Sequence, residues 1–316
     1  MRDSLSLVIL LFLFGLTSEA QTAKRSVALT FDDLPKALDS GNVIETRRTT
    51  SEILAALKRH RAPAIGFVNE RQLHVPGEMD ARIAVLQQWV QAGFVLGNHT
   101  FSHPDLQTTP LSQYEDDVIH GEVITRRLMR NAGSYQLYFR HPFTHTGPTR
   151  EVRTAFEEFL KTRGYKVAPF TIENSDYIFN KLYLDARKAN DQPLLRRVRV
   201  AYMDHNDAVF GFIEGLSREM FGREIIQILL IHANDINSDC MDEILKRLET
   251  RGYAFTTLDR ALEDKAYETR DEFVGRMGPS WLHRWTVSLG LKMKLDQEPD
   301  PPKWVMEMFQ KSLAPR

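Results

Sequence analysis

The chain has 316 residues, in which 41 Lys and Arg residues nearly balance 42 Asp and Glu residues. These charges are interspersed, which excludes the basic stripe that is typical of proteins that bind nucleic acid. The single cysteine, Cys240, has no partner for an internal disulfide, and we therefore expect an ordinary apolar core to stabilise the fold.

The first twenty residues have the features of a secretory signal peptide. Arg2 precedes an apolar run over residues 5–16 that is too short to span a bilayer, and small residues follow it up to Ala20. We expect cleavage after Ala20, with Ala23 as the second choice; Asp3 weakens the pattern, and an uncleaved signal anchor is the alternative. In either case the remainder is expected outside the cytoplasm, in the periplasm or the medium, with no stable membrane insertion after cleavage because no other segment is apolar enough.

Short β-rich runs alternate with longer amphipathic helical stretches after this leader. The predicted strands are residues 26–31, 64–68, 94–97, 136–139, 166–170, 226–231 and 254–257. The predicted helices are residues 46–59, 80–92, 112–132, 149–163, 183–220 and 241–251. The strands are short and almost entirely apolar, which is typical of parallel strands covered on both faces. The alternation predicts an α/β fold with parallel strands, either an open sheet or a barrel, with functional residues at the carboxyl ends of the strands.

We expect one catalytic domain over residues 24–264, followed by a C-terminal extension over residues 265–316. The extension differs in composition, since it carries Trp281, Trp285 and Trp304 and a proline-rich run. We interpret it as a cap that packs on the domain through its aromatic residues, and the sequence assigns it no chemistry.

Two acids, Asp32 and Asp33, end the first predicted strand. Adjacent carboxylates repel each other and raise the pKa of one of them unless a cation lies nearby. Neighbours in an extended chain point in opposite directions, so the two acids are expected to have different roles. The alternative is a turn or a helix cap, because Asp-Asp-x-Pro suits both.

Two histidines, His99 and His103, follow the third predicted strand. A spacing of four places both imidazoles on one face of a helical turn, where they can bind one metal ion. A carboxylate from another strand end would be the third ligand, and the Asp32–Asp33 pair is the first candidate. Two histidines, one carboxylate and an open position are typical of a catalytic metal site.

Three further polar residues stand at the ends of predicted strands or shortly after them: Arg140, Asp176 and His232. An arginine can hold a carboxylate by two parallel hydrogen bonds, although a solvated loop arginine is the alternative. His232 follows a very apolar strand, so it is either a core histidine or a proton donor.

In chain order these segments resemble the five motifs of the polysaccharide deacetylases, also called NodB-homology proteins or carbohydrate esterase family four. The matching segments are Thr30-Phe31-Asp32-Asp33, His99-Thr100-Phe101-Ser102-His103, Arg140-His141-Pro142-Phe143, Asp176-Tyr177 and Leu230-Ile231-His232. The resemblance spans residues 25–264 and implies a distorted (β/α) barrel of about seven parallel strands.

The resemblance also implies a metal site and a general base. Asp33, His99 and His103 would bind one divalent metal ion, with zinc expected first and cobalt or nickel as alternatives. Asp32 would take a proton from the attacking water, and Arg140 would orient Asp32. Bound zinc is suited to this chemistry, because it lowers the pKa of water to about 7 and polarises carbonyl groups.

By the same resemblance, His232 would be the general acid that protonates the leaving group, steadied by Asp176. The backbone N–H near Phe143 would help to hold the developing oxyanion, and Tyr177 would line the substrate side. A separate base and acid, each contributing about a hundredfold or more, complete such a hydrolysis.

The chain departs from the family pattern at three places. Leu34-Pro35 stands where the family has Gly-Pro, which suggests a reshaped entrance; Tyr177 replaces Trp; and Phe143-Thr144 replaces Tyr-Gly. His141 and His145 flank this last difference, and we expect both to face solvent, with an extra polar contact as the alternative.

The segment 181–223 is longer than a minimal barrel needs, and its position suggests a lid or wall over the site. Three of its residues are candidates for substrate contact: Tyr202, Asp204 and His205. Long loops on such scaffolds often carry function.

The function expected from these residues is metal-dependent removal of N- or O-linked acetyl groups from a glycan. A carbohydrate-binding protein on a retired enzyme scaffold is the first alternative, and a hydrolase of a small non-sugar amide is the second. The sequence names neither the glycan nor the native metal nor the oligomeric state.

Overall fold

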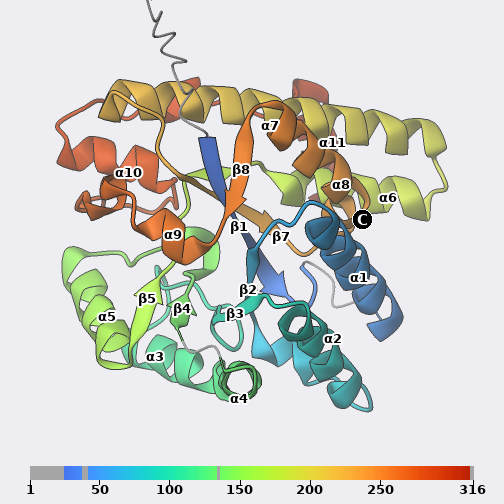
Figure 1. Ribbon diagram of the computed structural model, residues 1–316, viewed down its shortest axis with the longest axis horizontal. Helices are drawn as coiled ribbons and strands as arrows, with labels where there is room; N and C mark the ends of the chain where they lie inside the picture. Colours follow the sequence, from blue (N-terminus) through green and yellow to red (C-terminus); the bar gives the residue numbers. More distant parts are fainter. Residues whose placement is uncertain (1–24, 38–41, 134–135, 314–316) are drawn as a thin grey trace, which may run out of the picture.

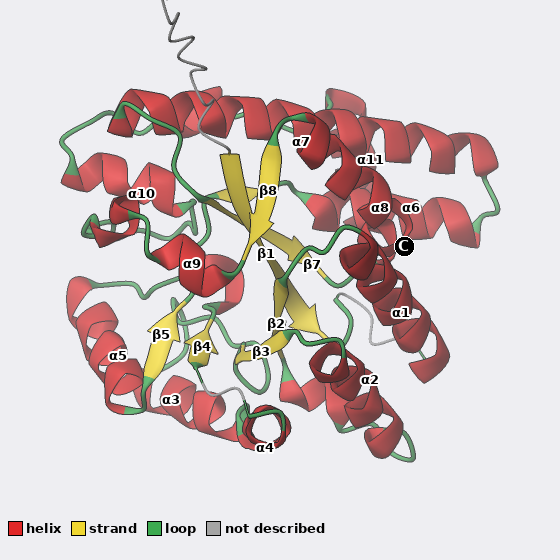
Figure 2. Cartoon of the chain, in the orientation of Figure 1, coloured by secondary structure: helices red, strands yellow, loops and turns green. Residues whose placement is uncertain are grey.

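The computed structural model describes residues 25–37, 42–133 and 136–313, so the predicted signal peptide lies outside the described residues. Eight parallel strands form one curled sheet, surrounded by helices (Figures 1 and 2). The strands are β1 (Arg25–Leu34), β2 (Ala64–Val68), β3 (Val95–Asn98), β4 (Leu137–Phe139), β5 (Tyr165–Val167), β6 (Ile172–Glu173), β7 (Gln227–His232) and β8 (Tyr253–Thr256). The predicted distorted barrel of parallel strands is confirmed.

The sheet runs in the order β5-β4-β3-β2-β1-β7-β6. The long strand β1 has three neighbours, because β8 pairs with its first half, β2 with its second half and β7 with most of its length. This central position buries β1, and from Val27 to Asp32 every residue is at most 2% exposed.

The helices cover the outside of the sheet. They are α1 (Val43–Arg59), α2 (Met79–Gln91), α3 (Leu111–His120), α4 (Val123–Asn131), α5 (Arg150–Thr162), α6 (Asp176–Lys188), α7 (Gln192–Phe221), α8 (Asp235–Thr250), α9 (Leu258–Leu262), α10 (Trp281–Ser288) and α11 (Lys303–Leu313). Four short 3-10 turns complete the elements: η1 (Glu70–Leu73), η2 (Pro142–Thr144), η3 (Lys265–Glu268) and η4 (Leu295–Gln297). None of the helices in the described part of the chain is long and apolar enough to cross a membrane.

Two predicted helices are each divided in two, and one short strand was not predicted. The helix predicted over residues 112–132 breaks at Gly121, where the backbone of Thr100 and Phe101 passes so close that a Cβ would lie 2.4 Å from the Thr100 carbonyl carbon. The helix predicted over 183–220 is α6 followed by α7, with Asn190 in the left-handed region between them. The strand predicted over 166–170 is β5, and a further short strand, β6, follows it at Ile172.

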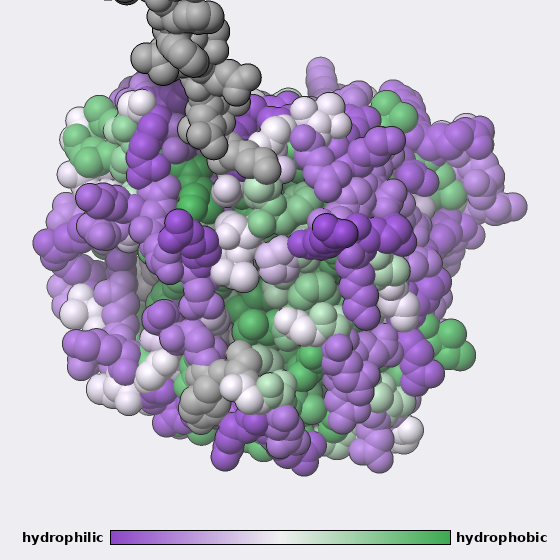
Figure 3. Space-filling model, in the orientation of Figure 1, coloured by the Kyte–Doolittle hydropathy of each residue, from purple (hydrophilic) through white to green (hydrophobic). Residues whose placement is uncertain are grey.

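The C-terminal extension packs against the rest of the chain. Trp281, Leu282, Trp285 and Val305 belong to the main apolar core, and the Trp281 N–H donates to the carbonyl oxygen of Phe170 at 2.9 Å. Helix α11 contacts α6, and α10 contacts α7 (Figure 1). Hydrophilic side chains cover most of the face seen in Figure 3, and apolar ones gather near its middle.

Candidate active site

A cavity of about 1090 Å³ lies where the carboxyl ends of the central strands meet. Its lining includes the residues that the sequence predicted from three different strand ends: Asp32, Asp33, His99, His103 and His232. Parallel strands bring their carboxyl ends to one edge of the sheet, so residues far apart in the chain meet here.

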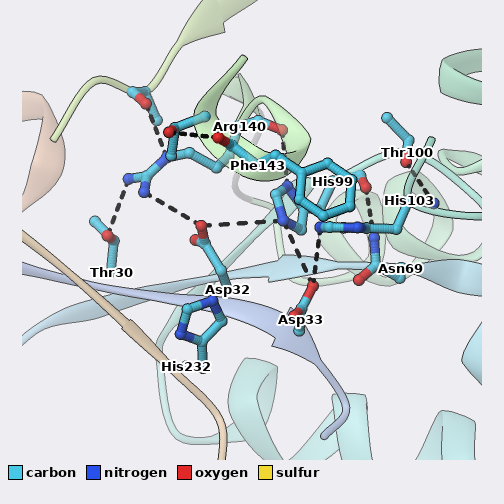
Figure 4. A network of polar contacts seen from close by, with 12 residues as sticks. Thr30, Asp32, Asp33, Asn69, His99, Thr100, His103, Arg140, Phe143 and His232 are labelled. Carbon is cyan, nitrogen blue, oxygen red and sulfur yellow. Dashed lines mark hydrogen bonds and ion pairs between the residues drawn. The ribbon is translucent and has the colours of Figure 1, made fainter. Parts of the chain in front are cut away.

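Asp33, His99 and His103 form a group that is able to hold a metal ion (Figure 4). Asp33 Oδ1 lies 3.5 Å from Nε2 of His99 and 3.5 Å from Nε2 of His103. Asp33 and His103 have φ values of 62° and 60°, and Thr100 between the two histidines has 67°. Non-glycine residues in the left-handed region are strained, and such strain is often found at functional sites.

The protonation of His99 bears on whether this group is able to hold a cation. Its Nδ1 lies 2.8 Å from the carbonyl oxygen of Arg140, and since a carbonyl only accepts, Nδ1 carries the proton. Burial lowers the pKa of His99 well below its ordinary value, so the ring is neutral and Nε2 presents a lone pair. That lone pair faces Asp33 Oδ1, which is buried and has no hydrogen-bond partner in the part of the chain that the structure describes. Two facing acceptors repel each other unless a cation lies between them, so the three side chains fit a divalent metal.

Asp32 is almost fully buried beside this group and is held by Arg140. Its Oδ2 lies 3.3 Å from Arg140 Nη1, while Oδ1 is buried and none of the described residues forms a hydrogen bond with it. Arg140 is fixed in turn, because it also donates to Thr30 Oγ1 and to the carbonyl oxygen of Ala168, each at 2.9 Å. Burial raises the pKa of Asp32 to about 6, although the Arg140 guanidinium opposes the rise. Such a carboxylate is suited to accept a proton near neutral pH.

His232 and Asp176 form a second pair of buried ionisable side chains in the site. His232 Nδ1 lies 2.7 Å from Asp176 Oδ1, and the His232 backbone N–H donates to Asp176 Oδ2 at 2.7 Å. Burial disfavours the imidazolium, but the carboxylates of Asp176, Asp33 and Asp32 outweigh it and raise the pKa of His232 to about 10. His232 is therefore protonated at neutral pH and able to give up a proton from Nε2.

The two predicted substrate contacts, Phe143 and Tyr177, also line the cavity. Phe143 is 53% exposed, and its ring packs edge-on against His103 with 4.5 Å between the ring centroids. Tyr177 is 40% exposed, and its ring contacts Phe309 of the C-terminal extension at 6.0 Å. Both therefore present apolar surface beside the polar group.

Residues 19–168 match the family model of polysaccharide deacetylase. The chain is 22% identical over 249 residues to the peptidoglycan-N-acetylmuramic acid deacetylase PdaA of Bacillus subtilis. This alignment covers 77% of this chain and 74% of that protein. It is 33% identical over 120 residues to the peptidoglycan-N-acetylglucosamine deacetylase of Bacillus cereus, covering 38% of this chain and 37% of that protein. The chain is therefore similar to the polysaccharide deacetylases, with the family match confined to residues 19–168. Among solved structures, Bacillus subtilis PdaA, a family 4 carbohydrate esterase, is similar with a TM-score of 0.47 and 20% identity over 78% of this chain and 82% of that one.

The first departure from the deacetylase pattern, Leu34 in place of glycine, lies in the core. Leu34 is fully buried and does not line the cavity, so the expected reshaping of the entrance is not seen at this residue. Its side chain packs over Gly66 of β2, where a Cβ would lie only 2.4 Å from a Leu34 methyl carbon. The larger side chain is thus accommodated by a glycine on the neighbouring strand.

The expectation that His141 and His145 face solvent is wrong. His141 is 3% exposed and lines the cavity, and burial lowers its pKa to about 3, so the ring is neutral. His145 Nδ1 lies 2.8 Å from Asp105 Oδ1, and the ring lines the same cavity. Both rings lie within a polar loop that tertiary contacts bury, and the local sequence carries no signal of that burial.

The long segment after β6 contributes one residue of the three that the sequence singled out. His205 lines the cavity, whereas Tyr202 is fully buried and hydrogen-bonds to Asn174 and Asn237, so it is a core residue. The Asp204 side chain is 70% exposed and lies outside the main cavity.

The sequence missed part of the wall of the site altogether. The C-terminal extension contributes seven residues to the cavity lining: Gly278, Pro279, Ser280, Leu295, Glu298, Pro299 and Asp300. Glu173, at the end of the short strand β6, lies in the same wall, and burial raises its pKa to about 7. The only signal for the extension was its aromatic content, which indicates packing but not its place beside the site.

Proposed function

We propose that this protein is a metal-dependent hydrolase that removes acetyl groups from a glycan. The observation that carries the proposal is the neutral His99 ring, whose lone pair faces the orphaned carboxylate oxygen of Asp33. A binding protein has no need to bring this metal group together with a buried base and a protonated histidine. The relatives named above act on peptidoglycan, so acetylated amino sugars are the first substrates to test.

A divalent ion held by Asp33, His99 and His103 would supply Lewis acidity and a water of lowered pKa. Asp32 is placed to take one proton from the attacking water, while Arg140 keeps its carboxylate in position. The water oxygen then forms a bond to the acyl carbon, and negative charge develops on the acyl oxygen.

Breaking of the bond to the sugar requires a proton for the leaving atom. His232 holds that proton at neutral pH, and Asp176 keeps the ring oriented through Nδ1, which leaves Nε2 to donate. Proton transfer from Nε2 gives a free amine or hydroxyl on the sugar and acetate as the second product. The proposal covers both N-acetyl and O-acetyl groups, since the same two proton transfers serve either leaving atom.

The proposal includes export of the mature chain, motivated by the predicted signal peptide. Acetylated glycans of the cell envelope lie outside the cytoplasm, so an exported enzyme would meet them. Expression of the full chain, followed by N-terminal sequencing of the protein recovered outside the cytoplasm, tests this part. A mature N-terminus at Gln21 or Lys24 is expected, and recovery of the intact chain from the cytoplasm would contradict it.

The main test combines metal content with acetate release by the chain from Gln21 onward. Zinc, cobalt or nickel is added to metal-free protein, and acetate is measured with chito-oligosaccharides, acetylated xylan and peptidoglycan. We expect about one metal ion per chain, because the described residues hold one group of three side chains that could bind a metal ion. His103→Ala should lose the metal and the activity, whereas His60→Ala removes an imidazole outside the cavity and should change neither.

Two outcomes would overturn the proposal in different ways. A protein that binds no divalent metal under any loading condition would be a carbohydrate-binding protein on a retired scaffold. If the protein binds metal but releases acetate from no glycan, the proposed metal site stands and the proposed substrate class is wrong. Small amides would then be tested.

A further inference from the structure

The loop that follows β4 is held in an unusual backbone conformation. Two consecutive residues, Phe143 and Thr144, have φ values of 53° and 56°, and neither is a glycine. Such residues cost about 1–3 kcal/mol each and persist only where surrounding structure holds them. The loop therefore requires contacts that stabilise it, and residues of the C-terminal extension, outside residues 24–264, supply part of them.

Arg284 of helix α10 makes the first set of these contacts. Its guanidinium donates to the Thr144 carbonyl oxygen at 2.6 Å, to Thr146 Oγ1 at 3.0 Å and to the Pro279 carbonyl oxygen at 2.8 Å. The side chain is fully buried and stacks on the Trp281 ring, 4.3 Å from its centroid. A rigid planar donor in this position fixes both the place and the direction of the loop carbonyl.

Gly278 makes the second set of contacts with the loop. Its carbonyl oxygen accepts a hydrogen bond from Thr144 Oγ1 at 2.7 Å. A Cβ at Gly278 would lie 1.8 Å from Thr144 Oγ1 and 2.4 Å from the Phe143 carbonyl oxygen, so only glycine allows this approach. Its φ lies outside the left-handed region, and the glycine is therefore needed for space and not for backbone freedom.

The loop held in this way borders the metal group. Phe143 packs against His103, and its backbone N–H has no acceptor among the described residues, while the neighbouring N–H groups of Thr144 and His145 are bonded within the loop. A free N–H at the edge of a catalytic cavity is available to a ligand oxygen.

We propose that Arg284 and Gly278 are positioning residues, through which the C-terminal extension holds the Phe143 N–H where it meets the acyl oxygen of the substrate. The inference rests on the proposed function for the identity of that oxygen. It assigns the extension a part in catalysis, because the strained loop would relax without it. Interactions made mainly in the transition state change kcat more than KM.

The test compares two variants with two matched controls. Arg284→Lys keeps the charge but loses the planar donor, and Arg270→Lys makes the same change at an exposed residue of the extension. Gly278→Ala pushes against the loop, whereas Gly215→Ala in α7 adds a methyl group that meets nothing within 4 Å. Three quantities are measured for each: kcat and KM with the best acetylated substrate, the absorption spectrum of bound cobalt, and amide hydrogen exchange over residues 140–147.

We expect both Arg284→Lys and Gly278→Ala to lower kcat by at least about tenfold, since complete loss of an oxyanion donor costs about 10²–10³ in kcat. KM and the cobalt spectrum should change little, because neither residue contacts a metal ligand. Exchange should become faster over residues 140–147 and stay unchanged over residues 95–104. Both controls should match the wild type in all three quantities.

Two results would overturn the inference. The first is an unchanged kcat with unchanged exchange in the loop, and the second is faster exchange throughout the chain together with loss of metal, which would show a general packing role. If the wild type releases no acetate, the proposed function fails, but the exchange comparison needs no turnover and still decides whether the extension holds the loop.

Discussion

Replacing Asp32 by asparagine keeps the shape of the side chain and removes its charge. We expect the metal-free variant to be more stable than the metal-free wild type at pH 8, although a base that the reaction needs has been lost. Asp32 is 2% exposed, and burial raises its pKa from 3.8 to about 6 despite the nearby Arg140. The ionised carboxylate is thus less stable in the folded protein than in the unfolded chain.

The sign and size of this expected change in stability follow from the linkage between protonation and folding. The folded pKa lies above the unfolded value, so this group lowers stability as pH rises from about 4 through 6, by about 3 kcal/mol at most. Asparagine does not titrate and resembles the protonated acid. Breaking a buried ion pair opposes the gain, but Arg140 keeps its bonds to Thr30 and Ala168 and can donate to the asparagine oxygen. We therefore expect a net gain of about 1–3 kcal/mol at pH 8.

Urea unfolding of EDTA-treated protein at pH 8 and pH 4.5 measures this difference. The gain should be largest at pH 8 and smaller by about 2 kcal/mol at pH 4.5, where Asp32 is protonated in the folded wild type but still mostly ionised in the unfolded chain. Asp242→Asn is the control, because this exposed acid should change stability by no more than about 0.5 kcal/mol. A variant that is less stable than the wild type at pH 8 would refute the reasoning. The metal-loaded variant should keep its metal and lose activity by about a hundredfold or more.

Three further changes test other parts of the structure. Asp176→Asn removes the first of the carboxylates that raise the pKa of His232, so the alkaline limb of the kcat–pH profile should move down by at least about one pH unit; an unmoved limb would exclude His232 as the general acid. Burial raises the pKa of Glu298 from 4.5 to about 7, so the folded protein loses stability as pH rises from about 5 to 8. Glutamine does not titrate, so Glu298→Gln should lack on the order of 3 kcal/mol of this loss, which unfolding curves across the same pH range would measure. Gly121→Ala would place a methyl group 2.4 Å from the Thr100 carbonyl carbon and should cost about 1–3 kcal/mol. Because Thr100 lies between His99 and His103, the two histidines of the proposed metal site, equilibrium dialysis should also show weaker metal binding for Gly121→Ala than for Gly215→Ala.

The sheet and the centre of the site follow closely from the sequence. Apolar runs of five or six residues specify buried parallel strands, and the topology then brings their carboxyl ends together. The predicted strand at residues 64–68 coincides with β2, and the acids near the end of β1 lie close to the histidines that follow β3. These features are predictable because they depend on the residue types of single strands and on one general rule of topology.

Contacts between distant segments explain most of the remaining differences. The helix predicted over residues 112–132 has a continuous pattern, and its break at Gly121 arises from the Thr100 backbone, twenty-one residues earlier in the chain. Leu34 is accommodated by Gly66 on another strand, and His141 is buried by surrounding segments. No local pattern carries such information, because each case depends on which backbone passes nearby.

The C-terminal extension shows the same limitation in its strongest form. Its tryptophans predict packing, and the structure places Trp281 and Trp285 in the core. What the pattern cannot show is that Arg284 and Gly278 reach the loop beside the metal group. The polar contacts lie between residues about 140 positions apart, and an arginine on a short helix has no local feature that distinguishes it from a solvated one.

A cation bound at the proposed metal site would change the protonation of Asp32. Asp32 Oδ2 lies 4.0 Å from His99 Nε2, the nitrogen that faces Asp33, so a cation bound by that nitrogen acts on Asp32 at short range. A nearby positive charge favours the ionised carboxylate and opposes the rise in pKa that burial causes. Metal binding would thus keep Asp32 ionised at neutral pH and remove the destabilisation predicted for metal-free protein. A ligand that binds only the folded state also stabilises it directly. The stability gap between wild type and Asp32→Asn at pH 8 should therefore narrow or reverse when metal is added.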